Sequence, residues 1–186
     1  QLSSDGQSID ESFSRAVLAS ASPYRSDHFS GLLEVKTLFG AALLLPARTI
    51  KQVGGFDPLF FAYGEEEDLC RRIRRSGFKL VVTPEAPVIH KRTNENRTVS
   101  DFVLFLRLKG AYLYNLKNPE LGFRYAVKHF ARDFLLDVQG KRSSTYPFNK
   151  YPIKLHNVLR AGVWVARHVF SIRQHRKLDR TIGPYV

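Results

Sequence analysis

The chain has 186 residues, 44% hydrophobic and 25% charged, which is enough apolar material for a packed core and argues against a disordered chain. A single cysteine, Cys70, excludes an internal disulfide framework and a cysteine-based zinc site. The apolar runs are far shorter than the ~20 residues that a membrane-spanning helix needs. Because the sequence begins at Gln1 and contains no methionine, we expect it to be part of a longer protein.

The formal net charge of +12 is unevenly distributed. Residues 1–93 contain 12 Lys and Arg against 11 Asp and Glu, whereas residues 94–186 contain 17 against 6. A balanced half can hold a chemical site, while a strongly basic half attracts phospholipid surfaces, nucleic acids or phosphate-bearing substrates. We therefore expect the two halves to have different roles.

The first half of the chain predicts short elements. Residues 1–37 begin with a segment rich in Ser, Asp and Gly, which predicts a linker or loop. An apolar run at 39–45 predicts a buried strand that ends at Pro46. Residues 46–53 predict a short helix with a proline in its first turn, and Gly54 terminates it.

Residues 65–76 give the clearest helix prediction. Four consecutive carboxylates, Glu65 to Asp68, occupy its first turn, arginines follow toward its end, and Gly77 stands where the helix should stop. That order of charges complements the helix dipole, so the acidic residues by themselves need no catalytic role. Strands are predicted at 78–83 and at 86–90.

The second half of the chain predicts helices at 101–116, 121–138 and 153–171. The third combines a broad apolar face with basic residues and with Trp164, a composition that suits the headgroup layer of an anionic membrane. In the alternative interpretation this helix packs on the catalytic domain and its basic side is simply solvated. Part of the apolar face could also form a dimer interface.

Residues 40–90 contain a series of motifs in a fixed order. Gly40-Ala41 is followed by Val53-Gly54-Gly55-Phe56-Asp57, then Phe60-Phe61-Ala62-Tyr63-Gly64-Glu65-Glu66-Glu67-Asp68-Leu69-Cys70-Arg71-Arg72, and then Gly77-Phe78, Pro84-Glu85-Ala86 and His90. The series strongly resembles the C-terminal half of the catalytic domain of family-2 inverting glycosyltransferases, especially the rhamnosyltransferase-like branch. Several elements match in order and spacing across roughly residues 38–92, which is more specific than any single motif.

The resemblance implies an α/β fold, namely part of a GT-A (nucleotide-diphospho-sugar transferase) sandwich with a mostly helical C-terminal extension. It divides the chain into a linker or loop segment (1–37), the C-terminal part of the catalytic domain (38–98) and a basic helical extension (99–186). In this family the N-terminal half binds the nucleotide and carries an Asp-x-Asp metal motif. That motif is absent from this sequence, so we expect the fragment to be inactive by itself.

The resemblance also assigns a catalytic base. An inverting transferase must take a proton from the acceptor hydroxyl, and a carboxylate within hydrogen-bond reach can do this. Aligning Tyr63-Gly64-Glu65-Glu66 with the family motif places Glu66 in this role. Many members have Asp there, so Glu65 stays a rival. Neighbouring carboxylates should raise the pKa of the base and make it stronger.

Other positions that match the family motifs are candidates for binding. Gly40, Phe61, Tyr63 and Asp68 are the substrate-binding candidates; the two aromatic residues would line the acceptor cleft, and Asp68 is expected to be more structural. In relatives, a histidine at the position of His90 helps to bind Mg²⁺ or Mn²⁺ on the donor diphosphate. Without the resemblance, His90 would more simply be a histidine at a strand end.

The sequence therefore predicts an enzyme that transfers a sugar with inversion. The donor would be a nucleoside-diphosphate sugar, and the acceptor a hydroxyl of a glycan or lipid-linked saccharide. We expect a cytoplasmic protein, with peripheral contact at the inner face of the plasma membrane, homo-oligomerisation left open, and no nucleic-acid partner. The alternative is a non-enzymatic basic module that binds an anionic membrane surface or nucleic acid, although the sequence contains no recognisable nucleic-acid motif.

Overall fold

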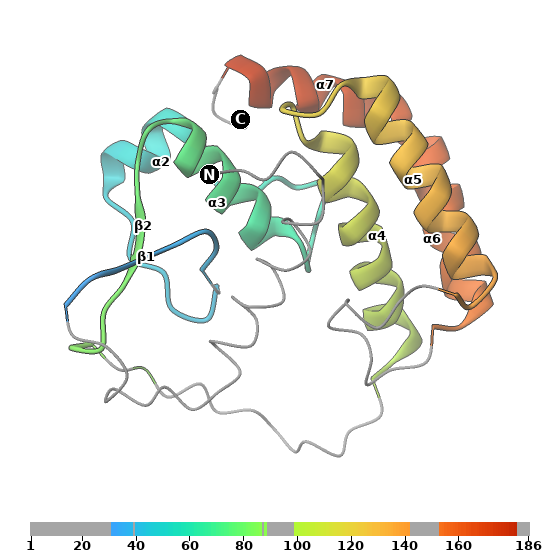
Figure 1. Cartoon of the computed structure of the whole chain (residues 1–186), viewed down its shortest axis with the longest axis horizontal. Helices are drawn as coiled ribbons and strands as arrows, with labels where there is room; N and C mark the ends of the chain where they lie inside the picture. The colour runs from blue at the N-terminus through green and yellow to red at the C-terminus, as the bar shows by residue number, and fades with distance from the viewer. Residues whose placement is uncertain (1–30, 39, 87, 89–98, 142–152, 182–186) are drawn as a thin grey trace.

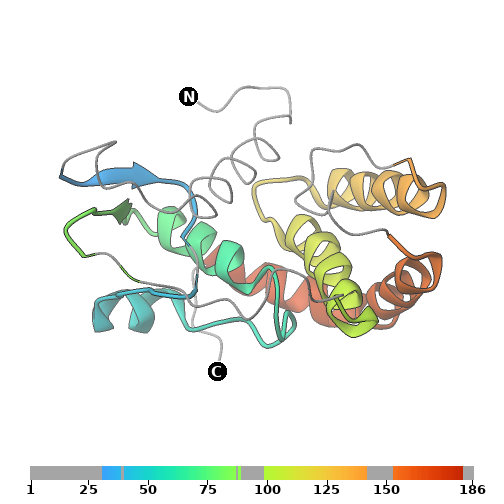
Figure 2. The ribbon, with the colours of Figure 1, turned by 90° about the horizontal axis from the view of Figure 1, so that it is seen from below.

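The computed structural model describes residues 31–38, 40–86, 88, 99–141 and 153–181. Its elements are β1 (Leu33–Val35), α2 (Ala47–Val53), α3 (Glu65–Arg75), β2 (Leu80–Val82), α4 (Asp101–Lys117), α5 (Phe123–Val138), α6 (Leu155–Arg167) and α7 (Val169–Thr181). The two strands, α2 and α3 lie on one side of the molecule, and α4, α5 and α6 lie on the other (Figure 1). Helix α7 runs from the end of α6 back toward α3, as the view from below also shows (Figure 2).

The four helices predicted between residues 46 and 138 are confirmed as α2, α3, α4 and α5. Helix α3 ends at the predicted position, because the Ser76 N–H caps the Arg72 carbonyl at 3.1 Å and Gly77 then adopts a φ of 85°. Glycine accepts that left-handed conformation without a steric penalty. Helix α4 begins at a serine cap, since the Val103 N–H donates to Ser100 Oγ at 3.3 Å.

The prediction of a strand at 39–45 is wrong. Residues 40–45 form no strand, and the side chain of Leu44 is 97% exposed, so this apolar run does not lie in a buried sheet. Strand β1 lies upstream instead and pairs antiparallel with β2, with Val35 opposite Leu80. The strand predicted at 78–83 is confirmed as β2, which is shorter than predicted.

The prediction for 86–90 falls mostly outside the described residues. Among the residues that the structure does describe, the β1–β2 pair is the only sheet, and helices dominate. The predicted helical C-terminal extension is therefore confirmed by α4–α7. A parallel sheet of the GT-A kind is not found in this part of the chain.

The helix predicted at 153–171 is two helices. Helix α6 ends at Arg167 and α7 begins at Val169. Between them, the backbone N–H and the ring Nδ1 of His168 both bond to the Trp164 carbonyl, at 3.1 and 2.8 Å. The buried side chains of α6 and α7 include Val158, Ala161 and Ile172, so these helices pack mainly on α4 and α5, within the helical extension itself. Toward the predicted catalytic part, α7 bonds to Asp57 through His175. No helix in the described ranges is both long and apolar enough to cross a bilayer.

Two buried hydrophobic clusters hold these elements together. The smaller one lies between α2, α3 and β2 and includes Val53, Leu69 and Ile73. The larger one lies among α4, α5, α6 and α7, and Phe60, from the loop before α3, is fully buried in it. This loop is therefore anchored in the helical extension, although α3 itself packs in the other cluster. Cys70 is buried, as predicted, and its burial raises the thiol pKa to about 11.

Candidate active site

The loop that leads into α3 has a strained backbone. Phe61 and Tyr63 have positive φ angles of 62° and 65°, and Gly64, which precedes the first residue of α3, has a φ of 100°. A non-glycine residue in this region costs on the order of 1–3 kcal/mol and persists only where its surroundings fix it. Such strain is concentrated at ligand-binding and catalytic loops.

Helix α4 supplies the contacts that fix this loop. The Lys109 ammonium donates to the carbonyls of Leu59 and Phe60 at 3.1 and 2.6 Å. One residue later, α4 approaches so closely that a Cβ on Gly110 would overlap the Tyr63 carbonyl oxygen. The loop is thus held both by charged hydrogen bonds and by close backbone packing.

A buried network of charges ties the loop and α3 to α4 and α7. Lys117 of α4 forms ion pairs with Asp57, with Asp68 at 3.1 Å and with Asp179 of α7 at 3.4 Å, and all four side chains are inaccessible to solvent. Removing one partner from such a buried group destabilises the fold by about 3–5 kcal/mol, because the remaining charges stay desolvated. The acidic helix therefore cannot shift independently of the helical extension.

Asp57, the last residue of the Gly-Gly-Phe-Asp motif, organises the turn. Its Oδ1 accepts hydrogen bonds from the Leu59 N–H and from His175 Nδ1, each at 2.9 Å. Burial alone would raise the pKa of Asp57, but His175 and Lys117 lower it to about 2. Asp57 is thus a permanently charged structural residue at neutral pH.

Asp68, a predicted substrate-binding residue, is fully buried. Its oxygens accept from Arg71 Nη2 at 2.6 Å and from Arg72 Nε at 3.0 Å, in addition to Lys117. Burial favours its neutral form, yet these three cations lower its pKa below the usual value. A ligand cannot reach this carboxylate in the structure, so its geometry fits the structural role that the sequence also suggested.

Glu66, the predicted base, lies in the first turn of α3 with its carboxylate against Gly40. The backbone N–H of Gly40 donates to this carboxylate, and a Cβ on Gly40 would overlap Glu66 Oε1. Burial raises the pKa of Glu66, the Gly40 hydrogen bond lowers it, and the charge of Glu65 raises it, with a net upward shift. The structure therefore brings together two of the predicted site residues and gives Glu66 a more basic carboxylate than that of a solvated glutamate.

The flanking carboxylates are also partly buried. Burial raises the pKa of Glu67 to about 7, with the charges of Glu66, Glu65 and Asp68 adding to this shift and the residue's own N–H opposing it. Glu65 Oε2 and Glu67 Oε2 are buried and have no hydrogen-bond partner among the residues that the structure describes. Incompletely satisfied carboxylates of this kind are typical of functional sites. From the sequence, Glu67 is one of four carboxylates that complement the helix dipole, and it is not among the candidate site residues.

The two predicted aromatic residues project from the strained loop. Phe61 is 74% exposed and contacts Phe102 edge to face, with ring centroids 6.4 Å apart. Tyr63 is 38% exposed, and the Arg107 guanidinium lies 4.8 Å from its ring centroid. Both rings present surface to solvent next to the acidic turn, as a flat binding surface for a sugar requires.

The predicted metal residue His90 lies outside the described residues. Within the described part of the chain, no group of three or more His, Cys, Asp or Glu side chains is arranged to hold a metal ion. These residues alone therefore do not fit a complete Mg²⁺ or Mn²⁺ site, and no chemical step below depends on one.

Sequence reasoning missed the residues that position the site from a distance. Lys117, His175 and Gly110 lie on helices far along the chain from the loop that they hold. A lysine or glycine within a helical pattern carries no local signal of such a contact. One indirect signal of these contacts is present in the sequence. Asp57 and Asp68 are carboxylates in a segment that must also pack against other elements.

Comparison with known proteins was consistent with the resemblance drawn from the motifs. Residues 23–96 match the family model described as the N-terminal domain of galactosyltransferase. No solved structure matches the chain significantly.

Two kinds of curated relative match part of the chain. A protein of Mycobacterium tuberculosis, named N-acetylglucosaminyl-diphospho-decaprenol L-rhamnosyltransferase, is 32% identical over 77 residues, which are 41% of this chain and 25% of that protein. Rhamnosyltransferase WbbL of Escherichia coli K12 is 31% identical over 75 residues, 40% of this chain and 28% of that protein. The chain spans about a quarter of the length of these relatives. The resemblance to rhamnosyltransferase-like glycosyltransferases is thus confirmed, for this segment of the chain.

Proposed function

We propose that this chain forms the acceptor side of an inverting glycosyltransferase, with Glu66 as the general base. The observation that carries the proposal is the contact between Glu66 and Gly40, which anchors a half-buried carboxylate of raised pKa beside an exposed aromatic loop. A GT-A sandwich would be completed by the nucleotide-binding half that such enzymes carry.

The proposed reaction uses both oxygens of the Glu66 carboxylate. One accepts the Gly40 N–H and fixes the side chain, while the other accepts the proton of the acceptor hydroxyl. As that proton leaves, the hydroxyl oxygen forms its bond to the anomeric carbon of the donor. The bond from the anomeric carbon to the leaving diphosphate breaks on the opposite face, and its electron pair departs with the nucleoside diphosphate. The product sugar therefore has the inverted configuration.

The proposed substrates follow from the relatives. One relative is named for transfer of L-rhamnose to N-acetylglucosaminyl-diphospho-decaprenol. We propose the same class here: a nucleoside-diphosphate sugar as donor and a hydroxyl of a lipid-linked or growing saccharide as acceptor. If a divalent ion, Mg²⁺ or Mn²⁺, neutralises the departing diphosphate, His90 would be one ligand and the others would come from outside the described residues.

A peripheral membrane contact is proposed for the face of α6 and α7 that the core leaves uncovered. Leu155, Leu159, Val163 and Phe170 are exposed. Arg160, Arg167, Arg173 and Lys177 are exposed on the same two helices. Apolar side chains next to basic ones suit an anionic membrane surface, where each Lys or Arg can add about 1 kcal/mol. Such contact would place a cytoplasmic enzyme at the inner face of the plasma membrane. A homo-oligomer would use the same exposed residues.

The decisive experiment is Glu66→Gln in the full-length enzyme. This change keeps the size and the hydrogen bond from Gly40 but removes the ability to accept a proton. We expect kcat to fall at least about 100-fold, the usual contribution of a general base, with KM for the donor little changed. Glu65→Gln serves as the matched variant in the same turn. Turnover close to wild type in Glu66→Gln, with a large loss in Glu65→Gln, would move the role of base to Glu65.

A further inference from the structure

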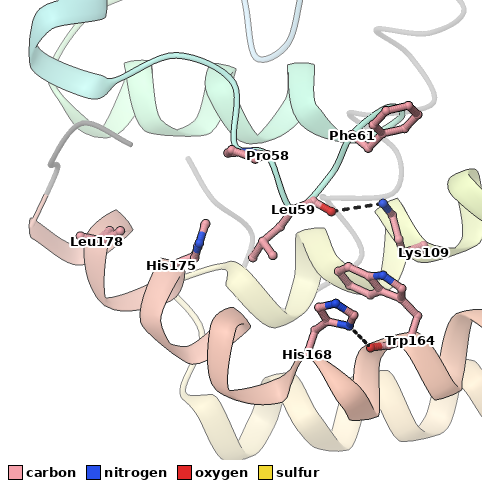
Figure 3. A pocket seen from close by; sticks show the side chains of 8 residues that line it. All are labelled: Pro58, Leu59, Phe61, Lys109, Trp164, His168, His175 and Leu178. Carbon is pink, nitrogen blue, oxygen red and sulfur yellow. Dashed lines mark hydrogen bonds between the residues drawn. The ribbon is translucent and has the colours of Figure 1, made fainter. Parts of the chain in front are cut away.

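A cavity of about 470 Å³ lies on the side of the strained loop that faces the helical extension (Figure 3). It is formed by Pro58, Leu59 and Phe61 of the loop, by Lys109 of α4, and by side chains of α6 and α7 on either side of the point where the two helices meet. None of the carboxylates at the start of α3 lines it. Its volume falls within the range of small-molecule sites, roughly 300–1,000 Å³. It is larger than a single phosphate needs.

One part of the cavity wall is basic. Lys109 lines it, and within the described part of the chain its ammonium donates two hydrogen bonds, both to loop carbonyls, of the three that it can donate. Burial lowers the pKa of Lys109 to about 8, while the charges of Glu65 and Asp57 oppose this shift. The ammonium is consequently still mostly protonated at neutral pH.

Two histidines on the opposite wall are held by fixed partners. His168 bonds through Nδ1 to the Trp164 carbonyl at 2.8 Å, and its ring stacks on the Trp164 indole with centroids 4.0 Å apart. Among the described residues Nε2 is therefore the ring nitrogen available to a ligand. His175 is oriented by Asp57, as described above. No Asp or Glu is among the lining residues, so Lys109 and the two histidines are the side chains of the lining that can bind an anion.

The rest of the wall is apolar. Pro58 and Leu59 from the loop and Leu178 from α7 line it (Figure 3). The indole of Trp164 does not offer an open face to a sugar, because His168 stacks on it and the Lys109 ammonium lies 4.9 Å from its ring centroid. Trp164 is thus a poor saccharide platform, whereas an anion attached to an apolar chain suits both parts of the wall.

We propose that this cavity binds a phosphate or diphosphate group together with the first part of an apolar chain attached to it. Lys109 and His168 would bind the phosphate oxygens, and Pro58, Leu59 and Leu178 would contact the chain. This inference rests on the proposed function, because a diphosphate-linked lipid is the carrier in the acceptor class named above. The same chemistry would also accept a free diphosphate, and the experiment separates the two sources.

The cavity carries its own probe, because Trp164 is the only tryptophan in the chain. The 186-residue chain is titrated with geranyl diphosphate, inorganic pyrophosphate or geraniol while the tryptophan emission is followed. We expect a saturable change with geranyl diphosphate at a Kd at least tenfold below that for pyrophosphate. Equal Kd values for geranyl diphosphate and pyrophosphate would support the anion site and indicate a free diphosphate as its source. Binding of geraniol as tight as that of geranyl diphosphate, or no response to either diphosphate, would overturn the proposal.

Variants test the assignment of the basic wall. His168→Phe keeps a ring that can stack on Trp164 but removes the nitrogen, and we expect the Kd for geranyl diphosphate to rise about tenfold. Lys109→Gln should weaken binding by at least as much. Lys128→Gln, at an exposed position of α5, removes a positive charge remote from the cavity and should leave the Kd within twofold of wild type. An unchanged Kd in His168→Phe overturns the assignment even if Lys109→Gln fails to fold.

The binding readout does not depend on catalysis. The 186-residue chain with Glu66→Gln should bind geranyl diphosphate as tightly as wild type, while the full-length enzyme with the same change loses transfer. If Glu66→Gln stays active but the cavity variants lose binding, the proposed base is wrong and the phosphate site stands. If transfer is lost in Glu66→Gln but no diphosphate binds, the phosphate site is wrong and the proposed base stands.

Discussion

Replacing Lys117 with methionine tests whether the buried charge network holds the loop before α3. The ammonium of Lys117 lies among Asp57, Asp68 and Asp179, all without solvent access. Methionine keeps a side chain of similar length but removes the charge, which leaves three buried carboxylates with less compensation. Removing one partner of a buried ion pair costs about 3–5 kcal/mol. That is a large share of the ~5–15 kcal/mol total stability of a domain.

The measurement is the free energy of unfolding in urea, followed by far-UV circular dichroism. We expect Lys117→Met to lower it by about 3–5 kcal/mol, with the midpoint shifting more than the slope. The double variant Lys117→Met/Asp57→Asn removes a negative charge as well, so its loss should be smaller than the sum of the two single losses by roughly 1–3 kcal/mol. A loss under about 1 kcal/mol in Lys117→Met, or strictly additive losses, would refute the reasoning.

Three further predictions address the loop, the pH dependence and the membrane face. Gly110→Ala should destabilise the protein by about 1–3 kcal/mol and lower kcat, because the new Cβ meets the Tyr63 carbonyl. In the control Gly162→Ala the new Cβ meets only a phenylalanine ring, so the free energy of unfolding in urea should fall by less. The pKa of Asp57 falls from 3.8 to about 2 on folding, so about 2 kcal/mol of stability should be present above pH 4 and lost as the pH falls toward 2. When the free energy of unfolding is measured against pH, Asp57→Asn should abolish this loss between about pH 4 and pH 2. A pH profile unchanged by the substitution would contradict the prediction. Phe170, 77% exposed, should contribute to cosedimentation with anionic vesicles, so that Phe170→Ser reduces it; equal binding to neutral vesicles would contradict a charge-assisted contact.

The start and end of α3 were readable from local sequence. The four carboxylates, the following arginines and Gly77 act on backbone groups within a few residues, which is why helix ends leave a strong local signal. The motif series around Glu66 likewise predicted the family resemblance from residues 40–90. The strand at 39–45 was mispredicted, because an apolar run predicts burial only if something covers it, and Leu44 is left exposed.

The sequence by itself determined that this chain carries a glycosyltransferase-like acidic turn followed by a basic helical extension. Only the tertiary structure decided that the extension holds the turn in place. Asp57 bonds to Lys117 and to His175, which are 60 and 118 residues away along the chain. In the sequence these are ordinary polar residues of helices. Whether such a charge is solvated or buried depends on the elements that pack over it, and chain neighbours carry no information about that packing.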